Sequence, residues 1–294
     1  MSAPLQGPAG TEVCPPAWLA MREPADADAR SAELAADLAA SLAATPPVAR
    51  AVSSGALLVR DLGCGTGSMA RWLAPRLPPR GGQHWVLHDR DPGLLEYAVA
   101  GLPAGVTGEA APGDLTRIDA AALAGTGLVV ASALLDLLDA DEVDALAEAC
   151  VTAGCPALLT LSVTGRVRLD PPDPLDPAIA AAFDDHQRRR AGTRRLLGPD
   201  AVSAAVTAFG RRGARVRTAP SPWRLGPDRS GLLREWLAGW LDAACTHRPG
   251  LRRVVGPYRE RREDELARGR LTVRVGHADL LAVPDTGSAA GERP

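Results

Sequence analysis

The sequence lacks lysine and asparagine altogether, so all 33 of its positively charged residues are arginine. Without lysine the chain cannot form a Schiff base with a substrate, and it cannot complete a Walker phosphate loop. Without asparagine it has no catalytic or ligand-binding amide of that kind. Aromatic residues make up only 3% of the chain, so its core must be mainly aliphatic. The 46% hydrophobic and 23% charged residues are typical of a soluble globular enzyme.

Cysteine is present, but not in a pattern that binds metal or builds a disulfide framework. The chain has five cysteines, an odd number, and they do not form the paired CxxC spacing of zinc sites. They are Cys14, Cys64, Cys150, Cys155 and Cys245. We therefore expect neither a metal site nor a disulfide framework.

Long hydrophobic runs are absent as well. The N-terminal residues show no basic start followed by an apolar block, so no signal peptide is indicated. The longest uncharged runs, between residues 119 and 136 and between 148 and 166, are too short for a membrane span. We expect a cytoplasmic protein without a membrane partner.

Charge is unevenly distributed along the chain, although the formal net charge is only −2. Residues 1–150 contain 9 arginines and 19 acidic residues, whereas residues 151–294 contain 24 arginines and 16 acidic residues. The halves thus carry −10 and +8. A basic half can attract an anionic ligand or a nucleic acid, but solvated arginine faces give the same composition.

Short apolar segments alternate with helical patterns through the first half. Strands are expected at 57–62, 84–89, 106–110, 128–132 and 157–161, and helices at 68–77, 93–100 and 141–149. An earlier amphipathic helix is expected at 30–43. This alternation predicts a parallel sheet whose ligands bind at the carboxyl ends of its strands.

Beyond residue 163 the pattern changes. A turn-rich connection at 170–177 precedes a helix at 178–190, which ends in arginines. A helix at 199–209, a strand at 215–219, a helical insert at 229–244 and 257–268, and a strand at 271–283 follow. The second half is therefore expected to complete the sheet and to add helices over it.

A glycine-rich turn follows the first expected strand. Residues 59–72 read VRDLGCGTGSMARW, with glycines at 63, 65 and 67. A dinucleotide fingerprint needs a third glycine where Ser68 stands. Asp61, two residues before the first glycine, would repel a pyrophosphate but could accept a hydrogen bond from an ammonium. The loop therefore favours a cationic ligand.

Two later acids suggest that this ligand is a nucleoside. Asp89 ends the second expected strand, where a carboxylate can accept hydrogen bonds from both ribose hydroxyls. Asp114 follows the third expected strand and could accept from an adenine amine.

Together these motifs resemble those of the class I S-adenosylmethionine-dependent methyltransferases. The resemblance rests on residues 59–67, 88–98, 113–114 and 128–138, and it covers about residues 55–165. It implies an α/β, Rossmann-like fold with a seven-stranded, mostly parallel sheet flanked by helices, and 271–283 as the reversed strand. It also implies S-adenosyl-L-methionine as cofactor. The positions it assigns to the cofactor are Asp61, Gly63, Cys64, Gly65, Gly67, Asp89, Arg90, Asp114, Leu115 and Ser132.

The resemblance suggests four regions. They are an N-terminal helical segment (1–54), a cofactor-binding core (55–165), the remainder of the sheet with a helical substrate cap (166–284) and a disordered tail (285–294). Trp18 to Arg22 lie where the family often closes over its cofactor, and Arg22 is a candidate for the methionine carboxylate.

The expected reaction is methyl transfer to a small-molecule acceptor, for which an anionic compound is one candidate. His186 is a candidate base, and Arg188, Arg189 and Arg190 could bind an anionic acceptor. A partly exposed helix histidine and a solvated helix end explain the same residues. The alternatives are a non-catalytic S-adenosylmethionine-binding protein and a methyltransferase acting on RNA or protein. Few aromatic residues are available to stack on bases, which disfavours a nucleic-acid partner.

Overall fold

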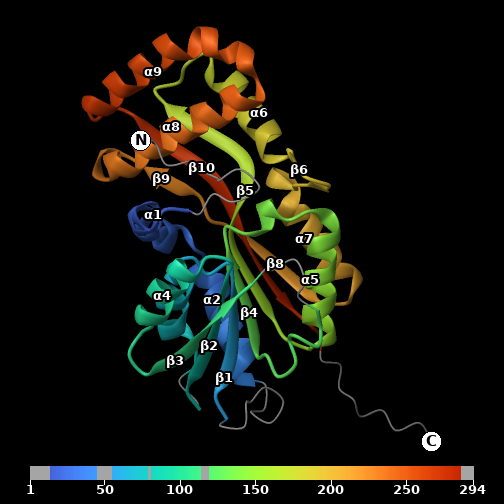
Figure 1. The fold of residues 1–294 in the computed structure, drawn as a ribbon. Coiled ribbons are helices and arrows are strands. Elements are labelled where there is room, and N and C mark those ends of the chain that lie inside the picture. The colour runs from blue at the N-terminus through green and yellow to red at the C-terminus, as the bar shows by residue number, and fades with distance from the viewer. Residues whose placement is uncertain (1–13, 45–54, 79–80, 114–118, 286–294) are drawn as a thin grey trace, which may run out of the picture.

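A computed structural model describes residues 14–44, 55–78, 81–113 and 119–285. One central sheet organises these residues (Figure 1), with the strand order β3-β2-β1-β4-β5-β10-β8 and with β9 paired to β10. The strands are β1 (Leu57–Leu62), β2 (Gln83–Asp89), β3 (Val106–Pro112), β4 (Leu128–Ser132), β5 (Ala157–Asp170), β8 (Arg215–Pro220), β9 (Trp223–Leu225) and β10 (Thr272–Val283).

The sheet is mostly parallel, as predicted. Strands β1 to β5 pair in parallel, and β10 runs antiparallel to β5, β8 and β9. The predicted Rossmann-like fold is confirmed, and the reversed strand lies where it was expected. The eighth strand, β9, was not predicted because three residues are too few to show an alternating pattern.

Nine helices of the described residues cover this sheet. They are α1 (Pro16–Ala29), α2 (Ala32–Ala44), α3 (Ser68–Leu73), α4 (Pro92–Ala100), α5 (Ala140–Thr152), α6 (Asp176–Gln187), α7 (Ala201–Arg211), α8 (Ser230–His247) and α9 (Arg252–Ala267). Among these described helices, none combines the length and the apolar character that crossing a membrane requires.

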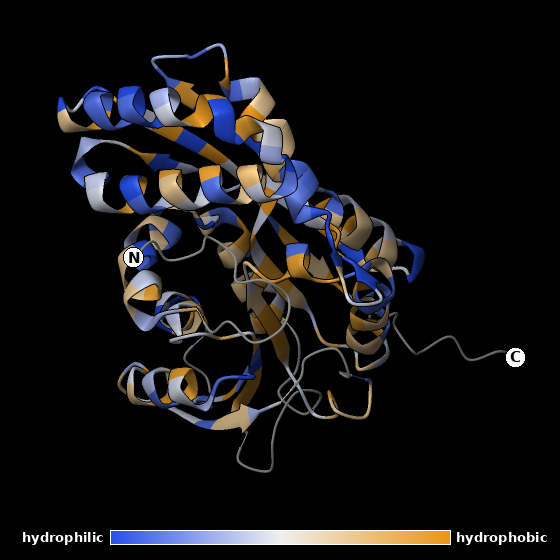
Figure 2. Cartoon of the chain, turned by 45° about the horizontal axis from the view of Figure 1, so that its top comes forward, coloured by the Kyte–Doolittle hydropathy of each residue, from blue (hydrophilic) through white to orange (hydrophobic). Residues whose placement is uncertain are grey.

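The helices bury three clusters of apolar side chains. Helices α5 and α7 pack on one face of β4, β5 and β10, and α2, α3 and α4 pack on the other face of the central strands. The third cluster joins α1, α6, α8 and α9 to β9 and to the outer parts of β5 and β10. Figure 2 shows the central strands as mainly hydrophobic and the outer helix α9 as mainly hydrophilic. Helices α6, α8 and α9 of this third cluster are the helical cap that the sequence led us to expect, and α1 packs against them.

Strands β5 and β10 connect the core to this cap. β5 has 14 residues and β10 has 12, and they remain paired from Ala157 opposite Ala282 to Asp170 opposite Thr272. The proposed boundary at residue 165 therefore falls inside a continuous strand.

The helix predicted at 178–190 is shorter than expected. It ends at Gln187, and Arg190–Ala191 (β6) then pairs with Arg194–Arg195 (β7). Gly192, with φ +65°, adopts the left-handed conformation between these short strands. A turn after three arginines thus replaces the last turn of the predicted helix. Of the predicted tail, residues 286–294 lie outside the described residues.

Candidate functional site

The glycine loop lies between β1 and α3, at the carboxyl edge of the sheet. Gly63, Gly65 and Gly67 have φ values of +67°, +55° and +83°, in the left-handed region that favours glycine. A Cβ atom on Gly67 would lie 3.1 Å from the Cα of Ala98, and one on Gly65 would lie 3.2 Å from a methyl carbon of Leu19. Backbone conformation and close packing therefore both require glycine here.

Asp89, at the end of β2, is held against this loop. Its Oδ2 accepts a hydrogen bond of 2.9 Å from Gly65 N–H, and its Oδ1 accepts one of 3.1 Å from Asp91 N–H. The structure therefore brings together two motifs that lie 24 residues apart in the chain. Each carboxylate oxygen has a second lone pair, so Asp89 can still accept hydrogen bonds from a ligand.

Asp61, on β1, is fully buried below the loop. Neither of its carboxylate oxygens has a hydrogen-bond partner in the described residues. Burial raises the pKa of Asp61 to about 7; the charge of Arg30 opposes this shift, and that of Asp89 adds to it. A buried carboxylate without a donor is costly, and a cationic ligand would relieve that cost.

Arg30 was not predicted as a site residue, although it is the buried cation nearest to this network. It lies between α1 and α2 with 4% of its surface exposed, and its Nη2 donates to the hydroxyls of Ser68 and Ser132 at 3.0 Å each. Burial lowers the pKa of its guanidinium. Ser132, which the resemblance assigned to the cofactor, is thereby tied to the start of α3. In the sequence, Arg30 stands out only as an arginine in an acidic segment, and that pattern does not identify a site residue.

Helix α1 is fixed over the glycine loop. Arg71, on α3, binds Glu23 through two hydrogen bonds of 2.7 and 2.6 Å, and its Nη1 donates to the Thr66 carbonyl at 2.6 Å. A helix thus lies over the loop, and its closing over a cofactor stays a prediction. Arg22 is engaged elsewhere: it pairs with Asp26 at 2.9 Å and lies over the Trp223 ring at 4.9 Å.

The remaining predicted cofactor residues have different environments. Cys64 is buried in the loop, and its N–H donates to the His88 carbonyl at 2.9 Å. Burial raises the pKa of the Cys64 thiol, so it stays neutral. Arg90 follows Asp89 and is exposed. Asp114 and Leu115 lie outside the described residues.

The predicted acceptor residues lie at the end of α6. His186 is half-buried, and burial lowers its pKa to about 4, with Arg189 and His247 adding to the shift. Arg188 forms an ion pair with Asp200 at 2.7 Å, and Arg189 donates to the His186 carbonyl at 3.2 Å. Arg190 is exposed in β6. Their roles in acceptor binding stay predictions.

Metal and disulfide chemistry have no structural basis in the described residues. All five cysteines are free thiols. Within the described ranges, no three His, Cys, Asp or Glu side chains are grouped so that they could hold a metal ion.

Comparison with known proteins gives a match at the level of structure only. No family model matches the chain, and no curated protein matches its sequence. The solved structure of loganic acid methyltransferase with S-adenosylhomocysteine is similar at a TM-score of 0.51 and 10% identity, over 92% of this chain and 95% of that one. A cyclopropane synthase from Mycobacterium tuberculosis aligns at a TM-score of 0.43 and 11% identity, over 77% and 78% of the two chains. The first likeness and the strand order show that the chain has the fold of the class I S-adenosylmethionine-dependent methyltransferases.

Proposed function

We propose that the chain is an S-adenosylmethionine-dependent methyltransferase with a small-molecule acceptor. The observation that carries this proposal is the pair of carboxylates at the glycine loop. Asp61 is buried without a hydrogen-bond partner in the described residues. Asp89 accepts a hydrogen bond from Gly65 N–H, and its carboxylate has further lone pairs that can accept from a ligand. An ammonium or sulfonium beside Asp61 would compensate its charge, whereas a pyrophosphate would add to it.

The residues present fit this cofactor by their chemistry. Asp61 and the loop glycines Gly63, Gly65 and Gly67 would hold the methionine part, and Asp89 would hold the ribose. Ser132 would lie next to the methionine part, and Cys64 and Arg90 would line the site. Asp114 and Leu115 remain predictions for the adenine. When bound, S-adenosylmethionine supplies a methyl group for in-line displacement.

The chain's own contribution is binding, orientation and the exclusion of water. The guanidinium of Arg30 ties Ser68 to Ser132 and so fixes the loop relative to β4. Glu23 and Arg71 hold α1 over the loop, where Leu19 places an apolar side chain against Gly65. Positioning of this kind can supply much of the rate when the acceptor already has a free lone pair.

A general base is not required by this proposal. His186 has a pKa of about 4 and is a weak base at neutral pH. An acceptor that carries its lone pair at pH 7 is therefore favoured over one that must first lose a proton. Arg188, a candidate for binding an anionic acceptor, already forms an ion pair with Asp200. The proposal of an anionic acceptor therefore rests on the sequence alone.

A small molecule is favoured over RNA or protein by the ion pairs of the second half. Four of its arginines bind acids of the first half: Arg194 binds Glu142, Arg212 binds Asp144, Arg217 binds Glu33 and Asp37, and Arg229 binds Asp28. These ion pairs offset part of the +8 charge of that half within the molecule.

The cofactor is tested by thermal unfolding. S-adenosylhomocysteine at 100 times its dissociation constant should add about 2.7 kcal/mol of stability, and NADH should add none. Stabilisation by NADH and not by S-adenosylhomocysteine would overturn the proposal.

Catalysis is tested separately with methyl-labelled S-adenosylmethionine. The purified chain is incubated with a metabolite extract, with RNA and with protein, and label should appear in the metabolite fraction. Label in RNA or protein would contradict the small-molecule acceptor. Cofactor binding without any label transfer would instead support a non-catalytic binding protein.

A further inference from the structure

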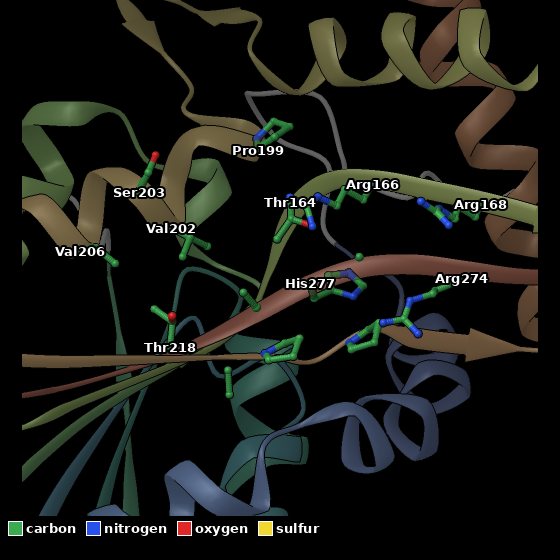
Figure 3. A pocket seen from close by; sticks show the side chains of 15 residues that line it. Thr164, Arg166, Arg168, Pro199, Val202, Ser203, Val206, Thr218, Arg274 and His277 are labelled. Atoms are coloured by element: carbon green, nitrogen blue, oxygen red, sulfur yellow. The ribbon is translucent and has the colours of Figure 1, made fainter.

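A cavity of about 730 Å³ lies beside β5, β10 and α7, and nothing in the proposed function uses it. Figure 3 shows Arg166 and Arg168 of β5, Arg274 of β10 and Val202 and Ser203 of α7 around it. Its volume is in the range of small-ligand pockets, about 300–1,000 Å³.

Three arginines form a row across the sheet, and two of them, Arg168 and Arg274, line the cavity. In the strand register Arg274 lies opposite Arg168 of β5 on one side and opposite Arg224 of β9 on the other. We call these three residues the arginine row. Arg166 is two residues before Arg168 and so lies on the same face of β5. Like charges directly opposite one another destabilise a sheet, so the row has a cost that packing does not explain.

The row also differs from most other arginines in its surroundings. The side chains of its members and of Arg166 form no ion pair and no hydrogen bond with any residue that the structure describes, and all four residues are exposed. Asp170, the nearest acid along the same face of β5, is not paired with them, and Asp200 beside the cavity is taken by Arg188. No carboxylate of the described residues therefore forms an ion pair with these four side chains.

The cavity is separate from the glycine loop. Val273 and Val275 of β10 belong to the buried cluster that contains α1 and α8. Arg274, between them, must point to the opposite face of the strand. Helix α1, which lies over the glycine loop, is on the side of the valines. A ligand in this cavity would therefore not occupy the proposed cofactor site.

We propose that this cavity is a second binding site, for a small molecule that carries a phosphate or diphosphate group. Several guanidinium groups in one hollow can neutralise more than one negative charge, and their forked N–H groups match phosphate oxygens. The hydroxyls of Thr164 and Thr218, which also line the cavity, can donate further hydrogen bonds.

A small anion fits this place better than a nucleic acid. The charge is gathered in a walled hollow instead of along an extended stripe, and the lining contains no phenylalanine, tyrosine or tryptophan on which bases could stack. The site does not depend on methyl transfer, so it can be tested without S-adenosylmethionine.

The experiment is calorimetric titration of the full chain with inorganic pyrophosphate and with inorganic phosphate at low salt. Pyrophosphate should bind, and more tightly than phosphate. Arg274→Gln, at the centre of the row, should weaken pyrophosphate binding at least about tenfold, because a hydrogen bond to a charged group is lost. Arg253→Gln, which removes an exposed arginine of α9, is the matched control and should leave binding unchanged.

Two further measurements test whether the effect of Arg274→Gln is confined to the cavity. Thermal unfolding and S-adenosylhomocysteine binding of Arg274→Gln should match the wild type, which shows that any loss is local. Absence of pyrophosphate binding to the wild type, or an equal loss in the Arg253→Gln control, would overturn the proposal. The proposal would also be overturned if a short single-stranded oligonucleotide bound more tightly than pyrophosphate and if Arg274→Gln weakened that binding.

Discussion

The glycine loop and the arginine row belong to the same sheet but leave charges of opposite sign unbalanced. At the loop the unpaired group is the carboxylate of Asp61, which is buried. At the row the unpaired groups are guanidiniums, which are exposed. Elsewhere several arginines form ion pairs, such as Arg212 with Asp144 and Arg217 with Glu33. The comparison shows that ion pairs between the two halves offset part of the uneven charge along the sequence, while the loop and the row each keep charge of one sign unpaired.

The largest effect is expected at the loop, from Asp89→Ala. This change removes the acceptor of the Gly65 N–H and the proposed partner of the ribose. Two charge-assisted hydrogen bonds correspond to about 3 kcal/mol, so S-adenosylhomocysteine should bind about 100-fold more weakly by calorimetry. The control is Asp91→Ala, which removes the cap of α4 at Gly93 N–H and should affect stability but not binding. Unchanged affinity in Asp89→Ala would remove Asp89 from the site.

The next effect concerns the protonation of Asp61. Its pKa of about 7 in the folded chain lies above the ordinary value, so the carboxylate becomes charged only as pH rises through 7. Affinity for the cationic cofactor should therefore increase up to several-fold between pH 6 and about 8. Asp61→Asn should bind more weakly at pH 8 and lose this dependence. A wild-type affinity that is flat over this range would contradict the proposed pairing.

The same group affects stability in the opposite direction. Because the folded chain holds the Asp61 proton more tightly than the unfolded chain, its contribution to the free energy of unfolding is greatest below pH 4. It is lost as pH rises to about 7, at up to about 1.4 kcal/mol per pH unit. Denaturant unfolding of the wild type and Asp61→Asn should show this slope only in the wild type.

A smaller effect is expected from Gly65→Ala. Its φ of +55° and the 3.2 Å approach to Leu19 both disfavour a side chain, and a cost of about 1–2 kcal/mol is expected in denaturant unfolding. Leu19→Ala removes the contact but leaves the backbone conformation of residue 65 unchanged. The loss of stability caused by Gly65→Ala should therefore be smaller when it is measured in the Leu19→Ala background than in the wild type. A coupling energy of zero would show that α1 does not restrict the loop.

The smallest effects should have opposite signs in the two kinds of arginine. Arg217→Gln breaks exposed ion pairs with Glu33 and Asp37 and should lower stability by less than about 1 kcal/mol. Arg274→Gln relieves repulsion in the row and should leave stability equal to the wild type or raise it by a few tenths of a kcal/mol at low salt. Both effects should fade at high salt. Equal losses of stability would remove the distinction between paired and unpaired arginines.

Much of the fold could be predicted because its signals are local. The first strand was placed at its observed bounds, Leu57–Leu62, since a short, mainly apolar segment before a glycine turn is typical of a buried parallel strand. The loop glycines and Asp89 were predicted from spacing, and the structure brings them together. The helix end at Gln187 was missed because Gly192, five residues later, turns the chain into a hairpin.

The rest depends on contacts between distant segments. Arg30 could not be identified because its partners Ser68 and Ser132 are 38 and 102 residues away. The arginine row could not be seen either, since it requires the register of β5, β9 and β10, strands that long helices separate in the chain. Composition indicated an excess of arginine in the second half but not which arginines remain unpaired.

The paired strands β5 and β10 set a limit on how a reactant can reach the loop. Both strands run from the core into the cap and stay paired on either side of the register shifts at Val275/His277 and Ala278/Leu280, so a hinge there would break backbone hydrogen bonds between them. Helix α1, by contrast, is held over the loop by side-chain contacts such as Glu23 with Arg71. Moving the cap helices relative to the core would therefore cost backbone hydrogen bonds, whereas moving α1 away from the loop would cost side-chain contacts, among them its buried contacts with Trp223.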